Sequence, residues 1–245
     1  MWGNCEVFGY SWSVARTVGF AGRGPWEDER DSVVKQARAE LTRQQIVAGA
    51  AAQFEKTGYG STSMADIVSG AGTTKGALYF HFASKDELAQ FIIAEQHRLS
   101  IESVQAISAT GKDPLEQMIM LTHEMARQIV DEPIVRAGIR LTLELSTYEG
   151  PVEPYAEWIS AITDLTARAQ AEGEIRKSVS AESFGRFMPS AFTGVQLVSN
   201  VLTRRSDLPD RVDEMWQILL PGIVSDDLSG DIERLVKSRW TPAAA

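Results

Sequence analysis

The sequence is short of the residues from which disulfide frameworks and most metal centres are built. Its 245 residues contain one cysteine, Cys5, and three histidines. A single cysteine cannot form a disulfide within the chain, which fits a reducing compartment, so we expect a cytoplasmic protein. The histidines have no cysteine or carboxylate cluster at metal-ligand spacing. We therefore predict no metal site and no cofactor.

Long apolar runs are also missing. The longest stretch without a charged residue, 187–203, still contains Pro189, Gln196 and Asn200. This composition predicts a buried helix and not a membrane span. The first residues lack a basic segment followed by an apolar one, so no signal peptide is expected.

Positive charge is scarce. The formal net charge is -9, which argues against a protein that binds nucleic acid over most of its surface. Residues 35–86 nevertheless contain six Lys or Arg and four Asp or Glu. A mildly basic segment on an acidic chain suits a local DNA footprint, because only the docking surface must meet phosphates. An enzyme is not indicated, since the sequence has no Gly-rich phosphate loop and no supported Ser/His/Asp set.

Alternating strand patterns and internal repeats are absent, which predicts an all-α fold. Ile46, Ala50 and Phe54 recur at helical spacing, and Gly58 is expected to end this first helix. Residues 1–34 are rich in Gly, Trp and Ser and show no periodicity. They are predicted to be a disordered or weakly ordered extension, with a DNA-contacting arm as the alternative.

Helix caps predict two short helices and then a long one. Ser63 is a natural N-cap for a helix to about residue 71, and Gly72 marks a turn. Thr73 or Thr74 caps the next helix, which is expected to end near residue 81 or 82. Ser84 then caps a long helix.

The remaining chain is predicted to be helical. Pro114 begins one helix, Pro133 separates two more, and residues 146–154 form a loop. Further helices are expected at about 155–172, 180–204, 208–220 and 228–238. Pro221 and Gly222 are expected to break or kink their helix, and the last few residues are expected to fray.

Two helices of about two turns joined by a very short turn are typical of a helix-turn-helix, whose second helix enters the major groove. Leu78 and Phe82 lie four residues apart and can anchor that helix from behind. Gly76 and Ala77 are small, so the backbone can approach base edges. An ordinary helical hairpin in a core is the alternative, although glycine in a short helix costs about 1 kcal/mol against alanine.

Several side chains of this segment can contact DNA. Thr74 and Lys75 lie at the helix N-terminus, where side chains and backbone N–H groups can meet bases and phosphate. Tyr79 and His81 can donate to phosphate oxygens. Lys85, which opens the next helix, can take another phosphate.

Residues 38–88 resemble the DNA-binding domain of TetR-class regulators. The residues that carry the resemblance are Thr42, Arg43, Ile46, Ala50, Phe54, Gly58, Tyr59, Thr62, Ser63, Ile67, Ala71, Gly72, Lys75, Gly76, Leu78, Tyr79, His81, Phe82 and Lys85. The resemblance implies a homodimer that reads a palindromic operator and a repression that a ligand relieves. It also places Arg38, Thr42 and Ser63 among the DNA contacts.

A narrower resemblance, to actinobacterial γ-butyrolactone receptors, spans nearly the whole chain from about residue 35. Its motifs are Arg38-Ala39-Glu40, residues 74–82, Arg136-Ala137-Gly138-Ile139-Arg140-Leu141 and Glu214-Met215-Trp216. It implies a γ-butyrolactone-like, furan or butenolide signal. A repressor that senses an antibiotic or another hydrophobic metabolite is the alternative, and a helical interaction protein that does not bind DNA is the alternative from another class.

The resemblance also implies three ligand contacts: Trp158, Gln96 and Thr193. Without it, Trp158 would be interpreted as a core tryptophan and Gln96 as a solvent-facing residue. Thr193 could instead bond its own helix carbonyl. We predict a DNA-binding domain over 35–83 and a ligand-binding and dimerisation domain over 84–240.

The resemblance to TetR-class regulators further implies that the two long C-terminal helices pair with their copies in a homodimer. Their apolar residues are Phe184, Phe187, Phe192, Val195, Val198, Val201, Leu202, Met215, Trp216, Leu219 and Leu220. Filling the core of a single subunit is the alternative role for these residues.

Overall fold

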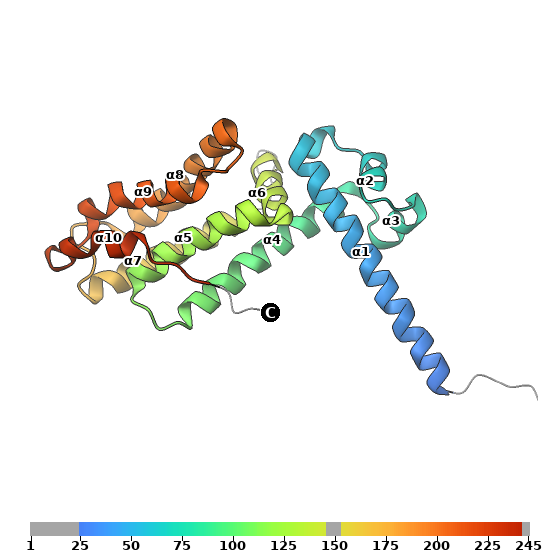
Figure 1. The fold of residues 1–245 in the computed structure, drawn as a ribbon, viewed down its shortest axis with the longest axis horizontal. Coiled ribbons are helices and arrows are strands. Elements are labelled where there is room, and N and C mark those ends of the chain that lie inside the picture. The colour runs from blue at the N-terminus through green and yellow to red at the C-terminus, as the bar shows by residue number, and fades with distance from the viewer. Residues whose placement is uncertain (1–24, 146–152, 242–245) are drawn as a thin grey trace, which may run out of the picture. The chain divides into compact units, whose positions relative to one another are not determined.

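The structure is a computed structural model that describes residues 25–145 and 153–241, and these residues form helices joined by short connections (Figure 1). The helices are α1 Pro25–Ser61, α2 Met64–Gly70, α3 Lys75–His81, α4 Lys85–Ser108, α5 Pro114–Asp131, α6 Pro133–Leu145, α7 Glu153–Ala171, α8 Ala181–Thr203, α9 Leu208–Ile223 and α10 Ile232–Val236. The described residues contain no β-strand, only an isolated bridge between Ile175 and Val224. The predicted all-α fold is confirmed.

The beginning of α1 corrects the predicted N-terminal boundary. The chain divides into two compact units, 1–40 and 41–245. Helix α1 begins at Pro25, ten residues before the predicted start of structure. In the sequence, Pro25 precedes Glu27 and Asp28, a combination that favours a helix start. Residues 1–24, 146–152 and 242–245 lie outside the described part. The predicted loop 146–154 is too long by two residues, because Glu153 and Pro154 already belong to α7.

Helix caps explain why the short helices begin and end where they do. Gly58 has φ of 80°, a left-handed conformation that ends the regular part of α1. The hydroxyl of Ser63 accepts from the N–H of Asp66 at 3.2 Å. Thr74 and Ser84 cap α3 and α4 in the same way. The predicted caps are confirmed.

The hydrophobic core of the helix-turn-helix region extends beyond α3, the last helix of that region. Buried residues of α1, α2 and α3 pack with Leu88 and Ile92 of α4 and with Leu141 of α6. The segment 35–83 therefore shares its core with the beginning of α4 and with α6. The first half of α4 belongs physically to this region.

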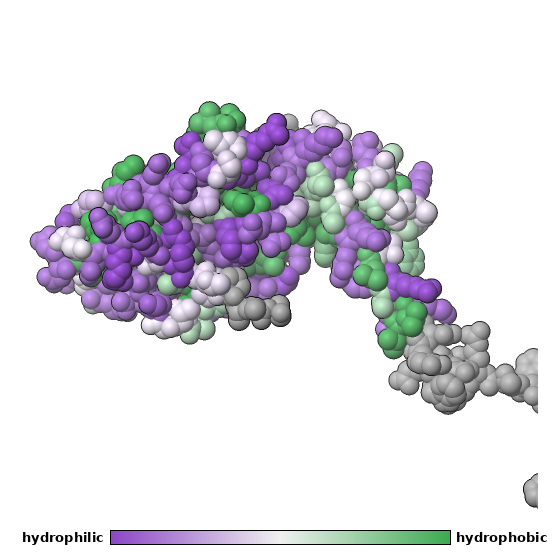
Figure 2. All heavy atoms as spheres, in the orientation of Figure 1, coloured by the Kyte–Doolittle hydropathy of each residue, from purple (hydrophilic) through white to green (hydrophobic). Residues whose placement is uncertain are grey.

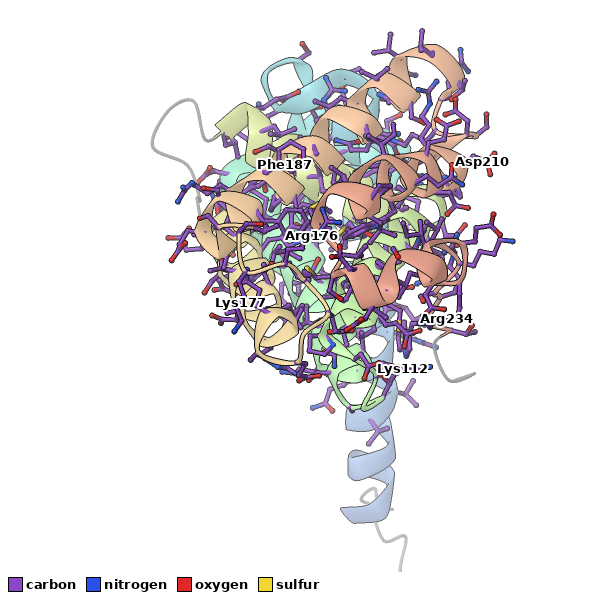
Figure 3. All side chains as sticks on the ribbon, turned by 90° about the vertical axis from the view of Figure 1, so that its left-hand side faces the viewer. Lys112, Arg176, Lys177, Phe187, Asp210 and Arg234 are labelled. Carbon is purple, nitrogen blue, oxygen red and sulfur yellow. The ribbon has the colours of Figure 1, made fainter. Side chains whose placement is uncertain are left out.

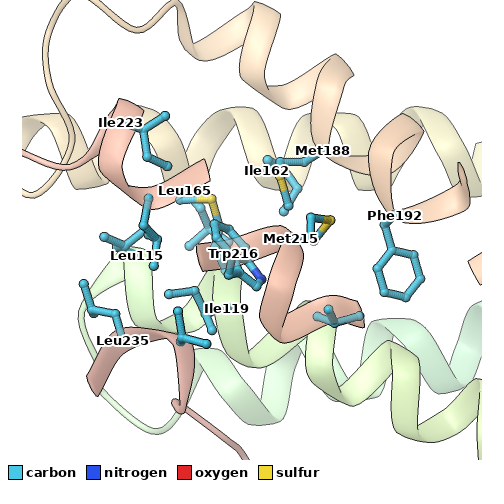
Figure 4. Packing of buried hydrophobic residues seen from close by; sticks show 14 of the residues in the cluster. Leu115, Ile119, Ile162, Leu165, Met188, Phe192, Met215, Trp216, Ile223 and Leu235 are labelled. Atoms are coloured by element: carbon cyan, nitrogen blue, oxygen red, sulfur yellow. The ribbon is translucent and has the colours of Figure 1, made fainter. Parts of the chain in front are cut away.

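A second core fills the C-terminal helices (Figure 4). Trp216 of α9 is fully buried at its centre, close to Leu165 and Ile119. Its indole N–H donates to the hydroxyl of Thr122 at 2.7 Å, so burial leaves this polar group satisfied. Trp216 therefore fills the subunit core, which was the alternative role for the C-terminal apolar residues.

Helix α9 continues through Pro221 and Gly222 to Ile223, where a break or kink had been expected. Leu220 is fully buried before the proline and Ile223 is buried after it. The N–H of Val224 still donates to the carbonyl of Leu220 at 3.0 Å. Burial on both sides outweighs the single backbone donor that proline removes. The last helix is shorter than predicted, because Asp226–Asp231 form a 3-10 turn before α10.

Candidate DNA-binding and ligand-binding sites

Helix α3 has one buried and one exposed face. Leu78 is fully buried and Phe82, its C-cap, is 3% exposed. On the opposite face Lys75 and Gly76 are exposed, as is Tyr79 at 46%. The Lys75 ammonium lies 5.8 Å from the centre of the Tyr79 ring. The predicted small-residue face is therefore open to a partner, while Leu78 and Phe82 hold the helix from behind.

The remaining predicted DNA contacts lie on three elements. Ala77 and His81 are partly exposed on α3, and the His81 ring meets Phe80 edge to face at 5.0 Å. Arg38 is exposed on the part of α1 within the N-terminal unit, and Thr42 is partly exposed further along the same helix. Phe80, which the sequence analysis did not select, is 79% exposed on α3.

Capping occupies the hydroxyls of Ser63 and Thr74. Ser63 accepts from the N–H of Asp66 and donates to its carboxylate at 2.6 Å, which lowers the pKa of Asp66. The hydroxyl of Thr74 accepts from the N–H of Ala77 at 3.1 Å. Both residues thus fix the ends of the two short helices, and Ser63 has its one hydroxyl proton committed.

The ammonium of Lys85, which was predicted to contact phosphate, points toward backbone carbonyls of its own chain. Its ammonium donates to the carbonyl of Tyr59 at 2.8 Å and to that of Thr62 at 3.0 Å. It also lies 4.2 Å from the centre of the Tyr59 ring. Lys85 therefore ties the start of α4 to the turn between α1 and α2. This orientation depends on tertiary packing, which the sequence pattern does not show.

The structure brings all three predicted ligand contacts to one cavity of about 370 Å³. Gln96 reaches it from α4, Trp158 from α7 and Thr193 from α8, and residues of α5 and α6 complete its walls. Apolar atoms supply most of the lining surface, although about half of the lining residues are polar and converge on the space. This is the usual composition of a small-molecule site.

Aromatic rings form one wall of the cavity. Trp158 packs edge to face against Phe192, with the ring centres 5.4 Å apart, and Tyr155 lies 6.3 Å from it. The hydroxyl of Tyr155 is 3.2 Å from that of Thr193. Trp158 thus presents a broad apolar face to the cavity, and its partners fix the orientation of that face.

Gln128 is a cavity residue that the sequence analysis missed. Its amide nitrogen donates to Ser103 at 2.7 Å and to Glu124 at 2.9 Å. Its carbonyl oxygen is buried without a hydrogen-bond partner. A buried, unpaired acceptor of this kind favours a ligand that brings a donor. The sequence offered no distinguishing signal, because Gln128 follows Arg127 and precedes Ile129 in a stretch of mixed charged and apolar residues.

Gln96 is also held against α6. A Cβ atom at Gly138 would lie 2.5 Å from the Cβ of Gln96, so only glycine permits this approach. The side-chain amide of Gln96 donates to the hydroxyl of Ser100 at 2.9 Å. The cavity wall on α4 is therefore in direct contact with α6, whose Leu141 belongs to the core of the helix-turn-helix region.

These features define a helix-turn-helix regulator with a small-molecule cavity. Among the described helices, none has the length and apolar character needed to cross a bilayer. Within the same residues, no group of three or more His, Cys, Asp or Glu is placed to hold a metal ion.

Two family models match the chain in these two regions. The model "Bacterial regulatory proteins, tetR family" matches residues 46–91, and "Tetracyclin repressor-like, C-terminal domain" matches residues 112–225. The A-factor receptor protein of Streptomyces griseus is 37% identical over 191 residues, covering 78% of this chain and 67% of that protein. The HTH-type transcriptional regulator TtgR of Pseudomonas putida is 36% identical over 215 residues, covering 81% and 89%.

Solved structures agree with these relatives. A crystal structure of a gamma-butyrolactone receptor, described as ArpA-like, has a TM-score of 0.70 at 33% identity and covers 82% of this chain and 96% of that one. CprB of Streptomyces coelicolor, in complex with its biological operator sequence, has a TM-score of 0.69 at 35% identity, covering 81% and 96%.

The chain belongs to the TetR family of bacterial regulatory proteins. Regulators of this family bind operator DNA and small-molecule ligands, typically as dimers, and are not enzymes. The chain is accordingly a ligand-responsive, DNA-binding transcriptional repressor.

Proposed function

We propose that this repressor senses a γ-butyrolactone-like signal, a class that includes furan and butenolide relatives, in the cavity around Trp158. The observation that carries the proposal is the convergence of Gln96, Trp158 and Thr193 on one largely apolar space. A small lactone with an aliphatic chain suits the aromatic wall, and a hydroxyl on it could donate to the unpaired oxygen of Gln128. The relatives named as A-factor and gamma-butyrolactone receptors support this ligand class.

We propose that α3 reads a palindromic operator through its exposed face. The proposed contacts from α3 and its cap are Thr74, Lys75, Gly76, Ala77, Tyr79 and His81. Arg38, Thr42 and Ser63 would contact the flanking DNA, with Ser63 also fixing the helix end that it caps. Lys85 is left out, because its ammonium is engaged by two carbonyls. A protein that binds operator DNA in a bacterium works in the cytoplasm, which is the location we propose.

We propose a homodimer formed through α8 and α9. Phe187, Val198, Val201 and Leu202 form one exposed apolar stripe along α8, and Ile218 of α9 is 78% exposed. Figure 2 shows hydrophobic residues gathered where α8 turns into α9. Figure 3 shows Phe187 on α8, apart from the charged Lys112 and Arg234. An exposed apolar stripe on long helices is typical of an isologous interface.

Helix α4 is the element that joins the two functions. Its first turns supply Leu88 and Ile92 to the core of the helix-turn-helix region, and its middle supplies Gln96 to the cavity. Two copies of α3 must lie about 34–36 Å apart, or a multiple, to fit one duplex. A ligand that prefers another arrangement of α4 would release DNA, and a shift from 99:1 to 1:99 needs about 5.5 kcal/mol of differential affinity per dimer.

The test selects operators from random-sequence DNA with the full-length protein and then measures gel retardation. We expect the selected DNA to share a palindromic consensus. A synthetic γ-butyrolactone should release the protein from this DNA, and its ring-opened hydroxy acid should not. Release by a hydrophobic antibiotic alone would overturn the ligand class and leave the repressor intact. Failure to enrich any sequence would overturn the operator proposal.

A further inference from the structure

A second cavity, of about 230 Å³, lies beside α1, α6 and α8. Three arginines line it: Arg136 and Arg140 of α6, and Arg205, which follows α8. The one carboxylate in its wall is Glu55 of α1. We call this space the arginine cavity. It is separate from the ligand cavity around Trp158, although Ile129, Ile139 and Gln196 line both.

Two of the arginines are well paired. The Nε of Arg136 donates to the Glu55 carboxylate at 2.7 Å, and its Nη1 donates to the carbonyls of Ile129 and Val130. The Nε of Arg140 donates to Glu144 at 2.6 Å, and its Nη1 donates to the carbonyl of Glu55 at 2.6 Å.

The positive charge of Arg205 has no carboxylate of its own to balance it. Its Nη1 lies 3.4 Å from the Glu55 oxygen that Arg136 already binds. Its side chain is 17% exposed, and its Nε is buried without a hydrogen-bond partner. Burial and repulsion from Arg136 lower the pKa of Arg205. Counting Glu144, three guanidinium groups face two carboxylates, so one positive charge is uncompensated.

The backbone beside the cavity has a conformation that is unusual for residues other than glycine. Arg204 and Arg205 have φ of 55° and 70°, two consecutive left-handed residues that are not glycine. Such conformations are costly for side chains with a Cβ and are often kept at ligand clamps. Arg204 is exposed, whereas Arg205 lines the cavity.

We propose that the arginine cavity binds a small, freely diffusing metabolite through a phosphate or carboxylate group. Arg205 is the residue that makes the principal contact with this anion. A guanidinium offers planar donors that match both kinds of group, and the amide of Asn200 on the cavity wall adds a donor. The volume far exceeds the roughly 10–15 Å³ that one water needs, so a phosphate fits with room for a small organic body.

The position of this site gives it a regulatory meaning that goes beyond the proposed function. Glu55 belongs to α1, the first helix of the helix-turn-helix region, and Gln196 also lines the ligand cavity. An anion bound here would compete with Glu55 for two arginines. Through linkage, its affinity would then depend on the state of both regions. Binding of the anion itself requires neither the recognition helix nor the Trp158 cavity to act as proposed.

The experiment uses the full-length protein without DNA. Inorganic phosphate and citrate are titrated by calorimetry against chloride at equal ionic strength, and thermal unfolding is followed by circular dichroism. We expect saturable binding of one anion per chain and an unfolding midpoint that rises with anion concentration. No saturable binding of either anion would overturn the proposal.

Arg205→Gln and Arg204→Gln are the matched pair, because both residues have left-handed backbone and only one faces the cavity. We expect Arg205→Gln to weaken anion binding about ten-fold or more and Arg204→Gln to change it less than two-fold. Equal losses in both variants would mean diffuse surface binding and would overturn the proposal.

A second variant covers the case in which Arg205→Gln does not fold. Asn200→Asp puts a carboxylate on the wall of the arginine cavity. We expect a higher unfolding midpoint without added anion and loss of the phosphate-dependent rise. A variant with unchanged midpoint and unchanged phosphate response would contradict an anion-binding role for this cavity.

Discussion

The cavity around Trp158 contains both apolar and polar recognition elements. The indole face supplies contact area at little cost in side-chain entropy, and the unpaired oxygen of Gln128 supplies an acceptor. An apolar ligand without a donor would leave that oxygen unsatisfied, at a cost of about 1–3 kcal/mol. Gln128 therefore favours hydroxylated ligands over plain hydrocarbons of the same shape.

Replacing Trp158 tests the sensing role of the cavity. Trp158→Ala should retain operator binding and lose release by the inducer, because the aromatic wall of the cavity is removed while α3 is untouched. Gel retardation with increasing inducer measures the change, and Trp240→Ala, outside the cavity lining, serves as the control. A normal response of Trp158→Ala would place the ligand elsewhere.

Glu174 is a buried carboxyl whose ionisation opposes folding. Its side chain accepts from the N–H of Leu115 at 3.2 Å, and burial raises its pKa to about 7. In the unfolded chain the group ionises at its ordinary, lower pKa. The folded state therefore holds the proton more tightly. The stability that this provides is present at low pH and is lost as pH rises through about 7.

Glu174→Gln should remove this pH dependence. An amide can accept from Leu115 without ionising, so the variant should gain stability relative to the parent chain above pH 7, by up to about 3 kcal/mol. Urea unfolding at pH 5 and pH 8 measures the difference. Glu172→Gln, at an exposed position, is the control. Equal stability differences at the two pH values would contradict the shifted pKa.

Among the elements, α3 is the one to which we assign operator recognition. Lys75→Ala should lose most operator affinity and reduce the salt dependence of binding by about one ion, because one phosphate contact disappears. Gel retardation at several salt concentrations measures both quantities. Lys177→Ala, an exposed lysine after α7, should bind like the parent chain. Parent-like binding by Lys75→Ala would remove this lysine from the interface.

Elements that depend on local signals could be predicted from the sequence. Ser63, Thr74 and Ser84 cap their helices as expected, because a cap is decided within four residues. Continuation of α9 past Pro221 could not be predicted, since burial of Leu220 and Ile223 decides it. The start of α1 was missed even though a local signal exists, because glycine and tryptophan dominate the preceding residues.

The site residues also separate into those that the sequence could predict and those that depend on tertiary packing. The exposed face of α3 and the convergence of Gln96, Trp158 and Thr193 were anticipated, the latter through the family resemblance. The inward turn of Lys85 was missed, because its acceptors lie more than twenty positions away in the sequence. The arginine cavity was missed for the same reason, since Glu55, Arg136 and Arg205 meet only in the folded chain.

At the scale of the whole molecule, the exposed stripe on α8 predicts how two copies associate. Val201→Glu should convert the dimer to a monomer and lower operator affinity sharply, because a charge would be buried in the interface. Light scattering coupled to size-exclusion chromatography measures the mass. Val130→Glu, at an exposed valine of α5, should remain dimeric. A dimeric Val201→Glu variant would move the interface away from this stripe.

The continuity of α4 has a consequence for anyone who builds chimeric biosensors from this scaffold. Ile93 still belongs to the core of the helix-turn-helix region, and Gln96, less than one helical turn later, already lines the cavity around Trp158. Inserting a single residue between them would rotate one module against the other by about 100°. Exchange of modules between such regulators should therefore splice α4 in helical phase, with heptad-length changes tolerated far better than shorter ones.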